Sequence, residues 1–173
     1  LNIVEEGLLN FAFAFEPKEE GLMERDPSDA QHREIVTGPV RNLIISAGVA
    51  TGLIIFGVYV VLQQTSMPIE EIRTIIFVAL SLDAIFFAFS IKNFHAPLWK
   101  INPFSNKYLV GSLVLSAGVL VLSVTFPPLR DLLSLTAISA VGLEILLGVA
   151  IVDLIIMEVA KRLVYPRRAT IAA

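Results

Sequence analysis

Residues 43–62 read LIISAGVATGLIIFGVYVVL, and none of these twenty residues carries a charge. A helix of that length is about 30 Å long, which matches the hydrocarbon thickness of a bilayer. The stretch therefore predicts a transmembrane helix. Gly48 and Gly52 give it a G-x-x-x-G spacing, which permits close helix contact but is frequent in membrane segments.

Three further apolar runs lie at about residues 74–91, 108–126 and 132–157. Each is long enough for one crossing, and the last is long enough for a tilted one. A proline pair follows residue 126, where proline cannot continue a helix. We therefore expect four transmembrane helices within residues 43–160.

The composition agrees with a membrane protein. The chain has 173 residues, of which 55% are hydrophobic, and its mean hydropathy is +0.77; soluble domains are roughly 45–50% apolar. It has no cysteine and a net charge of -3, so no disulfide or thiolate metal site is expected. No basic patch is interleaved with aromatic residues, and we expect no nucleic-acid partner. The predicted fold class is an all-α, polytopic membrane helical bundle of one truncated helix and four full transmembrane helices.

Acidic side chains interrupt two of the apolar runs. Asp83 lies within the 74–91 run, where an acid costs about 2.5–3.5 kcal/mol that the apolar neighbours offset by a few tenths each. It is either a functional residue or a hydrogen-bond partner of a neighbouring helix. For Glu144 the interhelical hydrogen bond or a protonated acid is the favoured interpretation. Asp153 lies closer to the end of the last run and is expected to reach the interface.

The first fifteen residues, LNIVEEGLLNFAFAF, carry a polar face on an apolar helix. Asn2, Glu5 and Glu6 stand at i, i+3 and i+4, and Asn10 lies one turn further along. The acids are either the solvated first turn of a helix or oxygen ligands inside a membrane. Because the chain begins on Leu within an apolar pattern, without a signal peptide, we expect a fragment that lacks the start of this helix.

Lys and Arg are distributed unevenly among the polar segments. Residues 16–42 contain four, residues 92–107 three and residues 161–173 four, whereas the intervening turns contain only Arg73 and Arg130. Positive charge collects on the cytoplasmic side of a membrane. The two loops and the C-terminal tail are therefore predicted to be cytoplasmic.

This orientation affects the interpretation of the first helix. Residues 1–15 would run toward the cytosol, so Asn2, Glu5 and Glu6 would begin inside the membrane and not in water. That placement disfavours the solvated first turn and favours an ion-binding face.

Several short segments carry a resemblance to a known family. Residues 2–7, NIVEEG, resemble the N-L-V-T-D-G of the sixth membrane helix in P-type cation-transporting ATPases. Residues 15–17, FEP, and residues 23–27, MERDP, are similar to the G-F-x-P and M-x-R-x-P that follow that helix.

Later segments match in the same order. Asn102 and Asn106 resemble the N-x-x-x-N that opens the ninth helix of bacterial members, and residues 126–129, FPPL, resemble the proline pair before the tenth. Residues 158–161 are similar to the E-x-x-K that closes it. The resemblance covers nearly the whole chain.

The resemblance implies the C-terminal membrane region, from the sixth to the tenth helix, of an ATP-driven cation translocase of the calcium-pump-like branch. No catalytic residue is expected in this chain, which contains no D-K-T-G-T motif; magnesium-ATP would bind elsewhere in the parent pump. The implied partners are the other helices and cytoplasmic domains of that pump and the lipid bilayer. Residues 16–38 would transmit the coupling, and a prokaryotic cytoplasmic membrane is the expected location.

The same resemblance implies a ligand set for the transported cation, with calcium the expected ion. Asn2, Glu5 and Glu6 occupy the positions of the family's sixth-helix ligands, and Asp83 is the nearest candidate for an eighth-helix acid. Glu5 replaces a neutral hydroxyl and Glu6 a shorter acid, so this site is more negative. Asp83 aligns one residue early, which is about 100° on a helix.

Two other classes of protein remain open. A secondary transporter or channel would use its membrane carboxylates without ATP and would show internal repeats, and none is visible between the apolar runs. A structural membrane subunit without its own site would use the acids as packing contacts.

Overall fold

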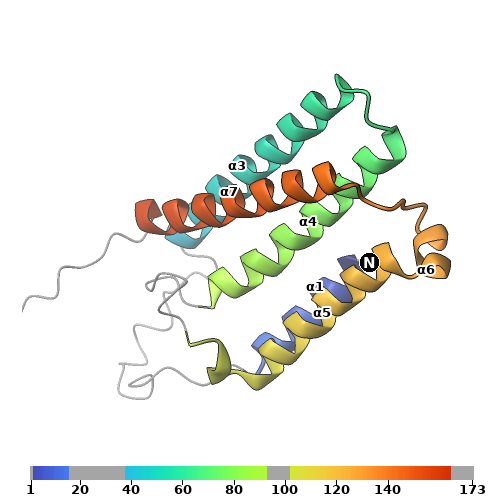
Figure 1. Cartoon of the computed structure of the whole chain (residues 1–173). Helices are drawn as coiled ribbons and strands as arrows, with labels where there is room; N and C mark the ends of the chain where they lie inside the picture. The colour runs from blue at the N-terminus through green and yellow to red at the C-terminus, as the bar shows by residue number, and fades with distance from the viewer. Residues whose placement is uncertain (1, 16–37, 93–101, 165–173) are drawn as a thin grey trace, which may run out of the picture.

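The computed structural model describes residues 2–15, 38–92 and 102–164, and within these ranges every regular element is a helix. The helices are α1 (Asn2–Phe13), α3 (Gly38–Gln63), α4 (Ile69–Ile91), the 3-10 helix η3 (Pro103–Ser105), α5 (Lys107–Thr125), α6 (Pro127–Leu132) and α7 (Ala140–Val164) (Figure 1). The predicted all-α fold class is confirmed.

Four of these helices are long and apolar enough to cross a membrane: α3, α4, α5 and α7. Together with their composition, this makes the chain an integral membrane protein. Residues 16–37, 93–101 and 165–173 lie outside the described residues. Most of the predicted loops at 16–42 and 92–107, and most of the predicted tail, therefore fall outside them.

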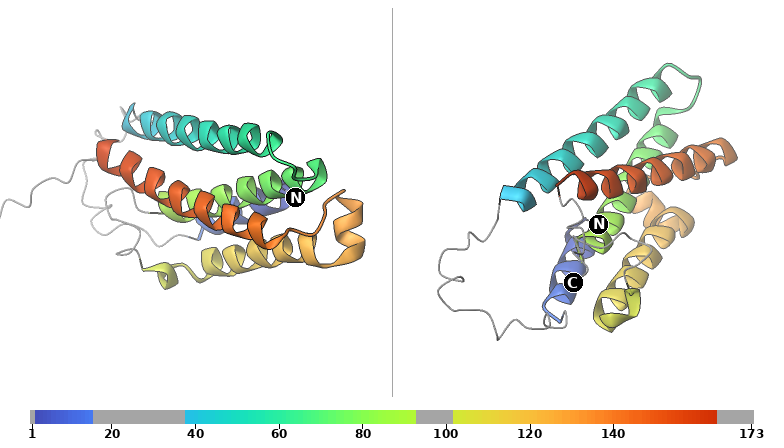
Figure 2. Two further views of the ribbon diagram at one scale, coloured as in Figure 1. Left: turned by 45° about the horizontal axis from the view of Figure 1, so that its top comes forward. Right: turned by 90° about the vertical axis from the view of Figure 1, so that its left-hand side faces the viewer.

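Helix α4 lies at the centre of the bundle. It packs against α3 and α7 on one side and against α1 and α5 on the other (Figure 1 and Figure 2). Of its most apolar stretch 39% is buried, against 17% to 22% for the other three spanning helices. The remaining surface of those helices is apolar and outward-facing, as a lipid-exposed or helix-covered surface is.

Two of the helices begin several residues before the apolar runs that predict them. Helix α3 starts at Gly38 and α4 at Ile69, each several residues before the predicted crossing at 43–62 or 74–91. Pro39 and Pro68 lie at these starts, where proline is tolerated because the first helical N–H groups have no intrahelical partner. The helices thus extend beyond the hydrocarbon-length run into polar flanks.

The glycine pair of α3 makes no close contact within the described part of the chain. A methyl group built on Gly48 or on Gly52 would meet no other atom within 4 Å. Both glycines are exposed. Any helix that packs on this face of α3 lies beyond the described residues.

The last long helix begins at Ala140, later than the predicted start near residue 132. The proline pair Pro127 and Pro128 does not simply end α5, because it starts the short helix α6. Ser134 then takes a positive φ of 54°, and residues 133–139 run as a non-helical segment.

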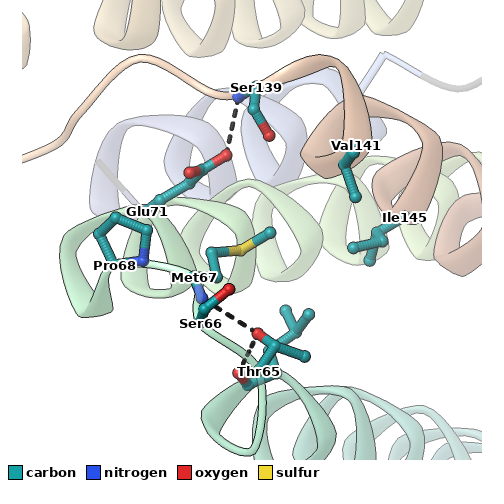
Figure 3. A pocket seen from close by; sticks show the side chains of 9 residues that line it. Thr65, Ser66, Met67, Pro68, Glu71, Ser139, Val141 and Ile145 are labelled. Atoms are coloured by element: carbon teal, nitrogen blue, oxygen red, sulfur yellow. Dashed lines mark hydrogen bonds between the residues drawn. The ribbon is translucent and has the colours of Figure 1, made fainter.

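Two polar side chains of α4 hold that segment in place. The Ser139 N–H donates to Glu71 Oε1 at 2.8 Å, and the Thr136 N–H donates to Thr74 Oγ1 at 3.0 Å. Figure 3 shows the Glu71 carboxylate at the start of α7. These two side chains satisfy backbone N–H donors just before α7. The contact with α4 therefore fixes the start of α7 at Ala140.

Helix α7 also continues to Val164, beyond the predicted end at 157 and into the predicted tail. Lys161 is therefore a helical residue, and it is buried, with 3% of its surface exposed. It interacts with Glu158, one turn earlier on the same helix.

Helix α1 is fastened to α5 by Asn106. The Asn106 Nδ2 donates to the carbonyl of Ala12 at 3.0 Å, while its Oδ1 accepts from the Leu109 N–H at 3.0 Å. Further along α5, Ser112 Oγ donates to the carbonyl of Leu8 at 3.2 Å. Asn106 thus caps the start of α5 and adds a second hydrogen bond to the Ala12 carbonyl, which also accepts from the Phe15 N–H at 3.2 Å.

Replacing Asn106 with Leu should lower the free energy of unfolding by about 1–3 kcal/mol, because it removes the cap of α5 and the hydrogen bond between α5 and the Ala12 carbonyl. The thermal unfolding of the purified protein in detergent measures this change. Asn102→Ala is the matched control, since Asn102 is exposed and its side chain accepts only a local bond from Phe104 N–H. Equal losses in both variants would contradict the role given to Asn106.

Replacing Gly142 with Ala should also destabilise the protein, by about 1–3 kcal/mol. The new methyl group would lie 2.6 Å from Ile138 Cγ2 and 3.1 Å from Glu71 Oε1, the oxygen that accepts from Ser139. Gly148→Ala on the same helix is the control, because nothing lies within 4 Å of that position. That control should be neutral or stabilising by up to about 1 kcal/mol, from helix propensity alone, and thermal unfolding again gives the comparison.

Candidate cation site between α1, α4 and α7

The predicted ligands Asn2, Glu5 and Glu6 all fall on α1, in its first two turns. The helical register places them on one face, as the sequence predicts. Their side chains lie outside the part of the chain that the structure describes. Asn10, one turn after Glu6 on that face, is the first polar side chain of α1 with a described position.

Asn10 and Asp83 line the same cavity. This cavity has a volume of about 310 Å³ and lies where α1 meets α4. Its other walls are apolar and come from both helices: Leu9, Phe13, Ala84, Phe87 and Ala88. Asn10, which lies on the polar face of α1, therefore shares this cavity with the membrane acid of α4.

Asp83 meets a second acid that the sequence placed elsewhere. Asp153 of α7 is not at an interface with water, because it is buried with 6% of its surface exposed. Its carboxyl group interacts with that of Asp83 across the contact of α4 with α7. Asp153 is thus the functional candidate that the sequence interpretation missed.

A signal for Asp153 is present in the helical spacing. The buried residues of α7 include Leu146, Val149, Asp153, Met157 and Ala160, which recur at intervals of three and four. That interval marks the inward face of a helix. Asp153 occupies a core position on this face. Its distance from the end of the apolar run does not reveal that position.

Glu144 does not join the site. It is exposed on α7, nine residues from Asp153, a separation that places it on the opposite side of the helix. No hydrogen bond from another described helix reaches it, so the predicted interhelical bond is not seen among the described residues. Glu144 is therefore a natural control for Asp153.

The side chains with described positions do not complete a metal site by themselves. Within residues 7–15, 38–92 and 102–164 no three His, Cys, Asp or Glu side chains come together. Calcium, a hard cation, is bound by about six to eight oxygen atoms. A calcium ion bound here would therefore need oxygens beyond these side chains.

The fold and these acids define a class: a polytopic helical membrane protein with carboxylates between its helices, as in proteins that move ions. The family is more specific. The model for "Cation transporting ATPase, C-terminus" matches residues 1–163, and the chain belongs to that family. The predicted resemblance to P-type cation-transporting ATPases is confirmed.

A curated relative is similar over most of this chain. "Calcium-transporting ATPase 1" of Bacillus cereus (strain ATCC 10987 / NRS 248) is 25% identical over 177 aligned residues, which cover 93% of this chain. Those residues make up 20% of the relative. The chain thus spans about a fifth of the length of the protein that it matches.

Proposed function

We propose that this chain forms part of the membrane domain of an ATP-driven pump for calcium or a similar hard cation. The observation that carries the proposal is the cavity shared by Asn10 of α1 and Asp83 of α4, in a member of the cation-transporting ATPase family. The name of the Bacillus relative supports calcium as the ion.

The proposed ligands are Asn2, Glu5 and Glu6 of α1, with Asp83 of α4 facing them. Glu6 is one turn from Asn10, and Asn10 lines the cavity with Asp83; this continuity supports a single site that draws on both helices. Carboxylate and amide oxygens are the ligands that calcium prefers. In hydrocarbon, the bound cation would also offset the cost of the acids.

The energy would come from the remainder of the protein. A match over 20% of a longer relative supports a parent chain with further domains, in which magnesium-ATP is bound and an aspartate is phosphorylated. The partners of this chain are then the other membrane helices and cytoplasmic domains of the pump. This role also accounts for the chain better than a secondary transporter or a structural subunit does, because neither belongs to the matched family.

The arrangement of helix ends supports the proposed orientation. Figure 1 shows the start of α3 and the end of α7 at one end of the bundle, and the turn between α3 and α4 at the other. Arg41 in the first turns of α3, and Lys161 and Arg162 in the last turn of α7, follow the positive-inside pattern. We propose that this end faces the cytosol, in the cytoplasmic membrane of a prokaryote.

Calcium-stimulated ATP hydrolysis by the complete pump tests the site. Glu6→Gln removes a charged ligand and should raise the calcium concentration for half-maximal stimulation by at least about tenfold, since each 1.4 kcal/mol of lost interaction is a factor of ten. Asp83→Asn should act in the same direction. Glu144→Gln, on the outward face of α7, should leave the curve unchanged.

Each contrary result is informative. If calcium does not stimulate the native pump, the transported ion is manganese, sodium or the proton instead. Normal stimulation of the Glu6→Gln variant would remove Glu6 from the ligand set.

A further inference from the structure

Three carboxylate oxygens are buried between α4 and α7 without a hydrogen-bond donor. They are both side-chain oxygens of Asp153 and Oδ1 of Asp83. Only 6% of the surface of Asp153 is exposed. The charged group that acts on it is the carboxyl group of Asp83. Two neighbouring acids that are buried away from water require either a cation or a shared proton between them.

The surroundings of the pair are apolar. One turn before the acids lie Ala79 of α4 and Val149 of α7, which belong to one hydrophobic cluster. One turn after them lie Phe87 of α4 and Met157 of α7, which belong to another. The two acids therefore lie between two hydrophobic clusters, where an uncompensated charge is costly.

The charged group that acts on each acid is the other acid, and no basic side chain of the described residues is among the groups that act on Asp83 or Asp153. Helix α3 packs against α7, and its buried side chains are Leu43, Ala47, Thr51, Ile55 and Leu62, none of which is charged. On α7 the nearest cationic groups, Lys161 and Arg162, interact with Glu158, and Arg162 Nε lies 3.6 Å from Glu158 Oε1. These two groups are more than two turns beyond Asp153.

We infer that Asp153 of α7 is an additional ligand of the transported cation, which it binds together with Asp83 of α4. The cavity beside Asp83, lined also by Asn10, gives a cation an approach from the α1 side. The inference rests on the proposed cation transport and extends the site to the last helix. The ligand class is a hard cation, because every group offered is an oxygen.

Equilibrium binding of radioactive calcium to the detergent-purified complete protein, without ATP, tests the inference. Asp153→Asn preserves the shape of the side chain and removes its charge. It should raise the dissociation constant by at least about tenfold, as should Asp83→Asn. The loss of affinity in the double variant should differ from the product of the two single losses, because two ligands of one ion are not independent. Glu144→Gln should bind like the native protein.

A thermal unfolding series separates a ligand from a structural residue. With calcium absent, Asp153→Asn should unfold at the same temperature as the native protein or at a higher one, because it removes one of two uncompensated acids. Added calcium should stabilise the native protein more than the variant, because a ligand raises the stability of the state that binds it. A variant equally destabilised with and without calcium would overturn the inference in favour of packing.

The failure of this inference differs from that of the proposed pump. Native-like calcium binding by Asp153→Asn, with binding lost in Glu6→Gln, would overturn the role of Asp153 and leave the proposed pump standing. Asp83 and Asp153 would then share a proton in place of a cation. If the native protein binds neither calcium, manganese nor sodium, both the inference and the proposed site are overturned.

Discussion

The polar side chains of α4 are the constraint on which this bundle depends. In hydrocarbon a helix satisfies its own backbone, so polar side chains decide which helices meet and where. Glu71 and Thr74 accept backbone N–H groups of the segment before α7, and Asp83 faces Asp153 further along the same pair of helices. Helix α4 thus contacts α7 through polar groups at two depths, with an apolar cluster between them.

The association of α1 with α5 follows a different rule. Here the polar groups are donors from α5, Asn106 and Ser112, and the acceptors are main-chain carbonyls near the end of α1. Leu9, Ala12, Ala88 and Leu109 pack beside them. The Ala12 carbonyl also accepts from the Phe15 N–H at 3.2 Å, so the donor on Asn106 adds a second hydrogen bond there and fixes the contact of α1 with α5.

Hydropathy predicts the number and order of the membrane helices, because burial in lipid acts on every residue of a crossing. It does not predict where α7 begins, since that boundary depends on Glu71 and Thr74, which are distant in sequence. Family motifs predict the ligand positions on α1. The helical spacing alone predicts that Asn10 lies on the same face, one turn after Glu6. The pairing of Asp83 with Asp153 requires the tertiary contact of α4 with α7, and a single helical pattern does not contain it.

The described helices divide into two groups that meet at α4. Helices α3 and α7 pack against one another and against α4, whereas α1 and α5 form a second pair, joined by the hydrogen bonds of Asn106 and Ser112. The cavity with Asn10 and Asp83 lies on the boundary between the groups. A shift of α1 relative to α4 that kept the hydrogen bonds of Asn106 and Ser112 would carry α5 with it and would change the width of this cavity.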